Sequence, residues 1–357
     1  MRSRSGLLSL LTASAVVLSA CSAAATPLPA PTAAAPTAAP TKTTDGTLPK
    51  PELATLKFGA AISEMSQFAP KVAEMEKIFD KYGVSVTVTV FNADGDAMQA
   101  LLSGQVDMAS VGAAGVINSW LTDNQSTQLA SFKVKVVDSL MCAASIKTAA
   151  DMKGKSVGVS TLGSTGHGSV LLALKALGMA QTDVVVTPVG GESARIAAMK
   201  AGSLACAPVG EVNVPVLQGL GFNVIVNLST SNLPYPASGV SATNAFLKKN
   251  PNTALVVVAA CLEAQNMMFS APTKVGADWA TFAQVKPEVA NPIVIASQNQ
   301  LNRTLRVPDG AFTFVQSVMA IAAPAISTVD AAKAYDGSYL QKLQDIGFFA
   351  KIGAPTN

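Results

Sequence analysis

The chain has 357 residues, of which 49% are hydrophobic, 5% aromatic and 13% charged, and its formal net charge is +3. This nearly neutral balance excludes the strongly basic surface that nucleic-acid binding requires, so we expect no nucleic-acid partner. The single histidine excludes a histidine-rich metal site, and the four cysteines show no CxxC spacing. We therefore expect neither a metal nor a cofactor.

The N-terminus has the three parts of a bacterial lipoprotein leader. Arg2 and Arg4 precede an apolar run over 7–18, and the sequence Leu-Ser-Ala-Cys ends at Cys21. Small residues before a cysteine suit a peptidase that cuts beside a lipidated thiol, and the run is shorter than the ~20 residues that span a bilayer. We expect a signal peptide over 1–20 and lipidation of Cys21. An ordinary signal peptide with an incidental cysteine is the alternative.

The segment after the leader predicts a flexible tether. Residues 21–52 are almost entirely Ala, Pro, Thr and Ser, a composition that cannot bury a core. The folded body is expected to begin near Leu53. Removal of the leader takes away two of the 25 basic residues and none of the 22 acidic ones, which leaves a formal charge of +1.

The body begins with an alternation of strands and helices. Strands are predicted over 56–60, 84–90 and 106–111, the second from its strict alternation of valine with serine or threonine. Helices are predicted over 70–82, opened by a proline and closed by Gly83, and over 98–102. This β-α-β-α-β order indicates an α/β fold with largely parallel strands.

The same order recurs later in the chain. Residues 104–112 align with residues 202–210, a shift of 98 (202 minus 104), and both segments begin and end with glycine. At this shift the strand predicted over 84–90 falls on residues 182–188, and the helix over 98–102 falls on 196–200. Two similar βαβ lobes are therefore expected.

Ligands of such sheets bind at the carboxyl ends of the strands, where loops and helix N-termini meet. The loop over 160–167 is the most specific of these, because hydroxyls and glycine-freed amides precede a helix over 169–177 and suit a negative or polar group. Its alternative role is structural, with a Ser or Thr cap and a glycine turn. The candidate ligand-binding residues in the strand-end loops are Ser63, Glu64, Gly112, Ala113, Gly163, Ser164, Thr165, Glu192, Glu211 and Asn213.

Four motifs together resemble a known family. They are 151–159 (DMKGKSVGV) followed by Gly163-Ser164, 100–107 (ALLSGQVD), 246–251 (FLKKNP) and 339–348 (YLQKLQDIGF). Their order and spacing resemble the substrate-binding proteins of nitrate/sulfonate/taurine-type ABC importers, a broad family that also includes binders of thiamine-precursor pyrimidines and riboflavin. The chain departs from the family pattern at Ala205, where an acidic residue is usual, and at Val212, where a proline is usual.

The resemblance implies a type II periplasmic-binding-protein fold with a hinged cleft between two lobes. Lobe 1 would contain 53–142 and 237–357, and lobe 2 would contain 143–236. The implied role is capture of a small-molecule ligand and delivery to ABC permease transmembrane subunits. The protein would be a lipid-anchored monomer on the extracytoplasmic face of the cell envelope, in the periplasm or on the outer surface of the cytoplasmic membrane, and its lipid would insert in the bilayer.

The ligand class follows from the side chains of the predicted cleft. Its loops offer three carboxylates, and the helical spacing of Arg195 predicts that this residue faces solvent, which disfavours a small inorganic anion. A zwitterion such as a taurine-like aminosulfonate fits better, and an N-heterocycle is the alternative. Phe68, Phe91 and Tyr235 are the candidate stacking platforms, whereas the two tryptophans, Trp120 and Trp279, are expected in the core.

Catalysis and ligand sensing are the two other roles that the sequence bears on. His167 follows a serine but not in a G-x-S-x-G elbow, so no catalytic residue is expected. A sensor lipoprotein that presents its ligand to a receptor would use the same two-lobe cleft.

Cys142, Cys206 and Cys261 lie in apolar stretches. They are expected either as buried thiols or with one disulfide, whose pairing the sequence does not decide.

Overall fold

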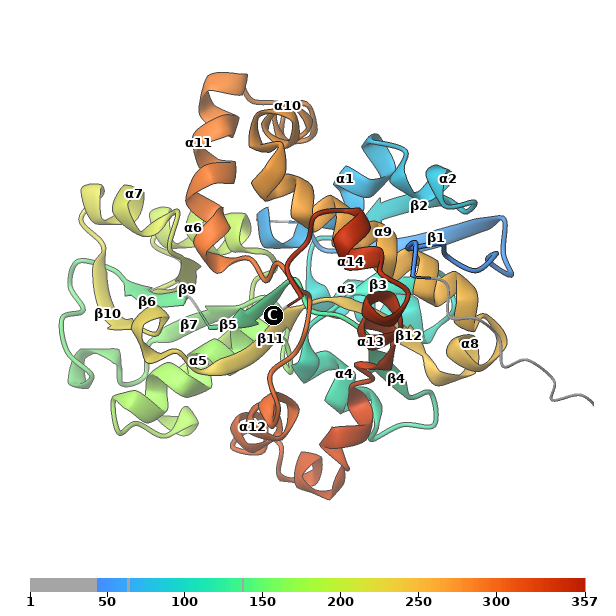
Figure 1. The fold of residues 1–357 in the computed structure, drawn as a ribbon. Coiled ribbons are helices and arrows are strands. Elements are labelled where there is room, and N and C mark those ends of the chain that lie inside the picture. The colour runs from blue at the N-terminus through green and yellow to red at the C-terminus, as the bar shows by residue number, and fades with distance from the viewer. Residues whose placement is uncertain (1–43, 63–64, 137, 357) are drawn as a thin grey trace, which may run out of the picture. The chain divides into compact units, whose positions relative to one another are not determined.

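The computed structural model describes residues 44–62, 65–136 and 138–356, which belong to one compact unit (Figure 1). Two five-stranded sheets and one two-stranded sheet organise this unit. The predicted leader and Cys21 lie outside the described residues.

The first sheet has the strand order β2-β1-β3-β12-β4. Its strands are β1 (Thr55–Ala60), β2 (Ser85–Val90), β3 (Met108–Ser110), β4 (Ser126–Gln128) and β12 (Val240–Thr243). The strands β1, β2 and β3 are parallel, and β12 runs antiparallel to β3 and β4. The helices that follow its strands are α1 (Ala69–Met75), α2 (Ile78–Lys81), α3 (Asp94–Leu102) and α4 (Ala113–Ser119).

The second sheet has the order β10-β6-β9-β7-β8. Read from the β8 edge, its parallel strands β8-β7-β9 repeat the arrangement β2-β1-β3, and an antiparallel strand lies next to them in each sheet, β6 here and β12 in the first. Its strands are β6 (Asp138–Cys142), β7 (Ser156–Val159), β8 (Val185–Pro188), β9 (Cys206–Gly210) and β10 (Asn223–Asn227), and its helices are α5 (Thr165–Ala176), α6 (Glu192–Lys200) and α7 (Val214–Gly219). The nine-residue helices α3 and α6 lie 98 residues apart (192 minus 94). The predicted repeat is therefore confirmed in its strand order and in its spacing.

The two sheets are joined where the chain crosses between them twice. The crossing strands β5 (Lys133–Lys135) and β11 (Pro234–Ser238) pair antiparallel. The strand β6 pairs with β9 and β10, so it belongs to the second sheet, whereas the sequence placed residues up to 142 in lobe 1. The helix α12 (Ala311–Met319) packs against β11, α4 and α5, so it contacts elements of both lobes (Figure 1).

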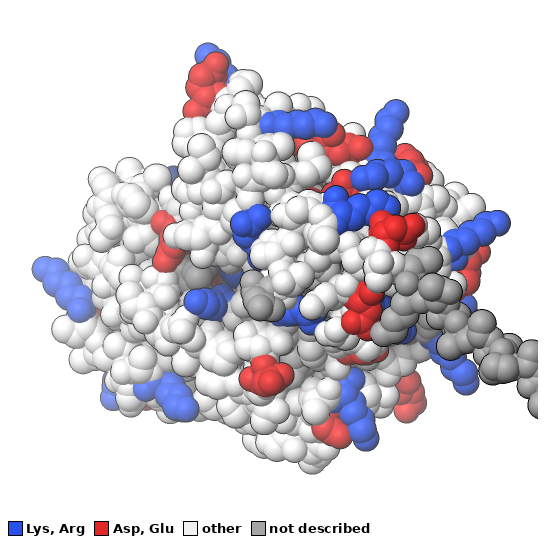
Figure 2. Space-filling view, in the orientation of Figure 1, with Lys and Arg blue, Asp and Glu red and all other residues white. Residues whose placement is uncertain are grey.

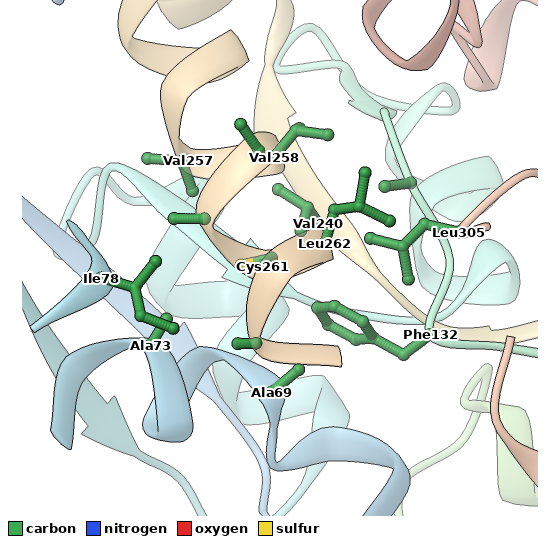
Figure 3. Close-up of a cluster of buried hydrophobic side chains, with 14 of the residues drawn as sticks. Ala69, Ala73, Ile78, Phe132, Val240, Val257, Val258, Cys261, Leu262 and Leu305 are labelled. Atoms are coloured by element: carbon green, nitrogen blue, oxygen red, sulfur yellow. The ribbon is translucent and has the colours of Figure 1, made fainter. Parts of the chain in front are cut away.

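The C-terminal helices complete the core beside the first sheet. They are α8 (Asn244–Lys249), α9 (Pro251–Ser270), α10 (Pro272–Ala283), α11 (Pro287–Ser297), α13 (Ser338–Asp345) and α14 (Phe348–Lys351), and a proline opens each of α9, α10 and α11. In Figure 3, α9 presents Val257 and Cys261 among side chains of α1, α2 and β12. Among the described helices, α9 alone is long and apolar enough to cross a membrane, and most of its residues are buried in the core.

Short 3-10 helices fill several connections. They are η1 (Met65–Gln67), η2 (Ala150–Met152), η3 (Gln181–Asp183), η4 (Ser229–Ser231), η5 (Gln298–Gln300), η6 (Pro324–Thr328) and η7 (Ala331–Ala334). The helix predicted over 70–82 is divided into α1 and α2, because Lys77 takes a left-handed conformation (φ 55°) that an α-helix does not continue through.

The ordered body begins earlier than the sequence predicted. The Gly46 N–H donates to the Ile346 carbonyl at 2.7 Å, and Leu48 packs on the core. The Glu52 carboxylate accepts hydrogen bonds from the Asn252 N–H at 2.9 Å and the Thr253 N–H at 2.6 Å, in the first turn of α9. Residues 44–52 are therefore packed on the body and are not part of a tether.

Candidate ligand-binding cleft

Three neighbouring cavities lie along the seam between the two lobes. The polar cavity, about 60 Å³, is central and contains Asp94, Lys133, Thr165, Glu192 and Arg195 in its wall. The apolar cavity, about 510 Å³, lies between α3, α4 and the 160–165 loop and shares Asp94 and Thr165 with the polar cavity. The side cavity, about 230 Å³, lies toward α10 and α11 and shares Glu192.

Three helix N-termini converge on the polar cavity. Its wall includes Asp94 at the start of α3, Thr165 and Gly166 at the start of α5, and Gly191 and Glu192 at the start of α6. The first N–H groups of a helix have no acceptor within the helix, and the helix dipole makes this end positive. The convergence therefore favours an anionic or hydrogen-bond-accepting ligand group.

Charged side chains also concentrate around this small space. Five of them line it: Asp94, Lys133, Asp138, Glu192 and Arg195. On the face shown in Figure 2, by contrast, basic and acidic side chains are interspersed and separated by wide uncharged areas. In a chain with only 13% charged residues, five around one cavity make it the most strongly charged of the three cavities.

Arg195 lies in the wall of the polar cavity and is 7% exposed. Its Nη1 donates to the Gly190 carbonyl at 2.9 Å and its Nη2 to the Pro208 carbonyl at 3.2 Å, while its buried Nε has no hydrogen-bond partner among the described residues. The expectation that Arg195 faces solvent is wrong. It shares the buried face of α6 with Glu192 and Met199, three residues before it and four after it.

The three carboxylates of the polar cavity already accept hydrogen bonds from the protein. Glu192 accepts from the Asn213 Nδ2 at 2.7 Å and from the Gly210 N–H at 3.2 Å. Asp138 accepts from the Ser169 hydroxyl at 2.5 Å, and Asp94 accepts from the Gln67 Nε2 at 3.1 Å. The carboxylates therefore have protein donors, whereas the buried Arg195 Nε–H has no acceptor among the residues that the structure describes.

Ser164 in the 160–167 loop caps a helix, which is the role that the sequence offered as the alternative to ligand binding. Its hydroxyl caps α5 by accepting from the His167 N–H at 3.3 Å and donates to the Thr161 carbonyl at 2.6 Å. The His167 Nδ1 accepts from the Gly163 N–H at 3.1 Å, and burial lowers the pKa of His167, so its ring is neutral at neutral pH. These contacts fix the loop in place and leave Thr165 and Gly166 in the wall of the polar cavity.

The structure distributes the predicted site residues over the whole seam. Gly112, Gly163, Ser164 and Thr165 line the apolar cavity, Thr165 and Glu192 line the polar cavity, and Glu192, Glu211 and Asn213 line the side cavity. Ala113 is fully buried as the first residue of α4 and is not in the wall of these cavities. Ser63 and Glu64 lie outside the described residues.

The aromatic expectations need two corrections. Tyr235 is fully buried, with its hydroxyl 3.6 Å from the Met319 Sδ, and Phe68 is also fully buried, so neither offers a stacking face to a ligand. Trp279, expected in the core, packs against the core and edge-on against Phe68 with ring centroids 4.9 Å apart, and it also lines the side cavity. The half-buried Phe91 is not in the wall of the three cavities.

Sequence reasoning missed Lys133 and Asp138, which line the polar cavity. Both lie at a crossing between the lobes, in or just after β5, so they reach the cleft from the crossing segment and not from a strand-end loop. A search limited to the carboxyl ends of strands could not find them.

The two lobes touch across the seam. The Asn118 Nδ2 of α4 donates to the Gly163 carbonyl at 3.3 Å, and the Gln300 Nε2 donates to Glu211 at 3.3 Å. A Cβ at Gly95 would lie 2.5 Å from the Thr161 Oγ1, so the absence of a side chain permits this approach. In the described conformation, these contacts hold α3 and α4 close to the 160–165 loop.

Comparison with known proteins identifies similar chains. The model of the NMT1-like family matches residues 49–281, and no curated protein matches the chain. A structure of a protein from Bordetella bronchiseptica RB50 is 20% identical with a TM-score of 0.72, over 83% of this chain and 99% of that one.

Two further structures have ligands stated in their names. The alkanesulfonate-binding protein SsuA from Xanthomonas axonopodis pv. citri, bound to MOPS, is 16% identical with a TM-score of 0.66, over 79% of this chain and 98% of that one. The periplasmic nitrate-binding protein NrtA from Synechocystis PCC 6803 is 16% identical with a TM-score of 0.65, over 83% and 89%.

Proposed function

Because this chain belongs to the NMT1-like family and has the fold of periplasmic binding proteins, we propose that it captures a small organic ligand between its lobes and delivers it to an ABC importer. The predicted family resemblance and fold class are confirmed by these comparisons. Support for the transport role comes from the sulfonate- and nitrate-binding proteins among the similar structures, and from a cleft large enough for a guest.

The proposed ligand carries an anionic head, as in an aliphatic sulfonate or a taurine-like aminosulfonate. The observation that carries this proposal is the buried Nε–H of Arg195, which has no acceptor within the described part of the chain and belongs to a residue in a cavity wall with three helix N-termini. A sulfonate oxygen would accept from this N–H and from the first N–H groups of α5 and α6. With Arg195 in the wall of the polar cavity, the part of the sequence objection that rested on Arg195 facing solvent no longer holds.

Ligand capture would work by closure. A ligand that contacts both lobes binds the closed state more tightly than the open state, and only this difference shifts the balance toward closure. The permease subunits would then distinguish the loaded from the empty protein. We further propose a hinge at β5 and β11, and a lipid-anchored monomer without catalytic activity on the extracytoplasmic face of the envelope.

An N-heterocyclic ligand remains the second candidate, because Trp279 offers an aromatic side chain to the side cavity. A flat pyrimidine or flavin ring would stack there. The two candidates differ in where the ligand makes its main contacts, at Arg195 or at Trp279.

The test of the proposed function is calorimetry with ethanesulfonate, taurine, nitrate and an aminopyrimidine. Arg195→Gln should weaken binding of the sulfonates by about 1.5 to 3 kcal/mol, the usual contribution of hydrogen bonds to a charged group. Lys200→Gln, which removes an exposed charge from the same helix, is the matched control and should leave the affinity unchanged. Equal sulfonate affinity in the wild type and in Arg195→Gln would contradict the proposed head site, provided that both proteins melt at similar temperatures.

A further inference from the structure

His167 is the single histidine of the chain, and its ring is buried in the first turn of α5, with 3% of the residue exposed. Its Nδ1 accepts from the Gly163 N–H at 3.1 Å. A ring nitrogen that accepts carries no proton, so the proton of the neutral ring is on Nε2. This Nε2 is buried and has no hydrogen-bond partner among the described residues.

Gly163 also joins the two lobes. Its carbonyl accepts from the Asn118 Nδ2 of α4 at 3.3 Å. Gly163 has a φ of 79°, in the left-handed region that favours glycine, and a Cβ there would lie 2.8 Å from the Asn118 Nδ2. The N–H that contacts His167 and the carbonyl that contacts Asn118 are therefore attached to one Cα. A movement that withdraws the N–H would displace the carbonyl as well.

Protonation of His167 would remove the acceptor for the Gly163 N–H. An imidazolium has a proton on both nitrogens, so its Nδ1–H would face the Gly163 N–H as two donors without an acceptor between them. The buried Nε2–H gives the charged ring no compensating contact within the described part of the chain. Burial accordingly lowers the pKa of His167 below its ordinary 6.5. The charged ring requires that the 160–167 loop move away from it.

Charged side chains around α5 do not offset this burial. The helix packs mainly against β6, β7, β9, β10, α4 and α12, in whose described residues Asp138 of β6 is the one charged side chain. The Asp138 carboxylate already accepts a hydrogen bond from α5. On α5 itself, Lys175 lies eight residues after His167 (175 minus 167), about 12 Å by the rise of a helix. Three further charged side chains line the polar cavity beside the loop: Asp94, Glu192 and Arg195.

We infer that His167 is a positioning residue that makes the contact between the lobes depend on pH. Its neutral ring holds the backbone of Gly163 so that the carbonyl meets Asn118, and its charged ring does not. The 160–165 loop contributes to the walls of the apolar and polar cavities, so a ligand in the cleft binds less tightly in acid. This effect on the ligand rests on the proposed function, whereas the coupling of His167 to Asn118 does not.

The first experiment is an NMR titration of the ligand-free protein, prepared without a histidine tag so that one imidazole gives the ring signals. The ¹⁵N shifts at pH 7 should show a proton on Nε2 and none on Nδ1. Asn118→Ala should raise the measured pKa of His167 by about 0.4 to 1, because charging the ring then no longer costs a contact between the lobes. Asn299→Ala, at an exposed position of η5, is the matched control and should leave this pKa unchanged.

The second experiment is calorimetry with ethanesulfonate at pH 7 and at pH 5. The affinity of the wild type should fall at least about threefold at the lower pH. His167→Asn, whose side-chain oxygen offers an acceptor that does not titrate, should lose less than half as much. Burial raises the pKa of Asp278 to about 6, so this carboxyl titrates in the same range. Asp278→Asn is therefore the control and should keep the pH dependence of the wild type.

Two NMR results would overturn the inference: a proton on Nδ1 of the neutral ring, or the same pKa in Asn118→Ala as in the wild type. Equal pH dependence of the affinity in the wild type and in His167→Asn would overturn its ligand-binding part. If ethanesulfonate binds at neither pH, the proposed head site fails. The titration, which needs no substitution of His167, then still decides whether this residue is coupled to Asn118.

Discussion

Glu52 ties the start of the folded unit to the helix at its core. Its carboxylate accepts from N–H groups in the first turn of α9 and from the Thr253 hydroxyl at 2.8 Å, although no side chain of α9 itself caps this end. A carboxylate at a helix N-terminus also interacts favourably with the helix dipole. Burial opposes ionisation, but the hydrogen bonds from Asn252 and Thr253 outweigh it and lower the pKa of Glu52 below its usual 4.5.

This contact predicts a pH-dependent contribution to stability. Glu52→Gln should lower the free energy of unfolding by about 0.5 to 1 kcal/mol, the lower part of the range for a lost cap, because the side chain is exposed and screened. Since the folded pKa is lowered, the contribution is complete above pH 5 and is lost as the pH falls through the folded pKa. Urea unfolding of both proteins at pH 7 and at pH 3 measures it. An equal difference at the two pH values would contradict the prediction.

Single residues were the hardest feature to predict. The sequence placed Thr165 and Glu192 correctly near strand ends, because the β-α-β pattern locates those loops. Arg195 was misassigned because helical spacing alone does not say which face is buried. Its position four residues before the buried Met199 was the available signal. Lys133 carried no such signal, because it lies at a crossing whose location depends on the tertiary structure.

At the scale of elements, a disulfide joins two neighbouring strands of the second sheet. Cys142 at the end of β6 pairs with Cys206 at the start of β9, 64 residues away in sequence, whereas Cys261 is a buried free thiol. A crosslink that closes a loop of this length restricts the unfolded chain. Of the pairings that the sequence left open, the structure contains this one.

Replacement of both cysteines by serine should therefore destabilise the protein. From the length of the loop, the free energy of unfolding should fall by about 4 kcal/mol. The measurement is guanidinium unfolding of the variant and of the wild type with and without a reducing agent. Reduction should lower the midpoint of the wild type toward that of the variant and leave the variant unchanged. A variant as stable as the oxidised wild type would contradict this expectation.

The elements themselves were largely predictable, and their exceptions have local causes. Period-two valines indicated β2, and the helices predicted over 98–102 and 196–200 lie within α3 and α6. The break at Lys77 was not visible, because the apolar stripe continues through it from α1 into α2. The strand β6 was assigned to the wrong lobe, since membership of a sheet is decided by pairing with β9 and not by composition.

At the scale of the molecule, closure depends on how near the lobes can approach. Gly95→Val would place its side chain against Thr161, where a Cβ already lies within 3.0 Å of three atoms of that residue. The variant should hold the lobes apart and weaken ligand binding at least tenfold, because the closed state becomes less populated. Small-angle scattering should show less compaction on ligand addition than in the wild type.

The control for this variant is Gly219→Val, a helical glycine with open surroundings in α7. It should close and bind as the wild type does. Undiminished affinity and compaction in Gly95→Val would show that the approach of Gly95 to Thr161 is not needed for closure. The repeat of strand order made two lobes predictable, but the contacts that close them join residues with no pattern in the sequence.

The position of α12 indicates at which edge the two lobes can separate. This helix packs on α4 of one lobe and on α5 of the other, and its Met319 meets Tyr235 in the crossing strand β11. Tyr235 in turn fills the space that Gly168 of α5 leaves empty. Separation at this edge would break a continuous core, whereas the edge beside α7 and α11 is bordered by the side cavity. We therefore expect the two lobes to separate at the edge next to Trp279 and to stay joined at the edge that α12 covers.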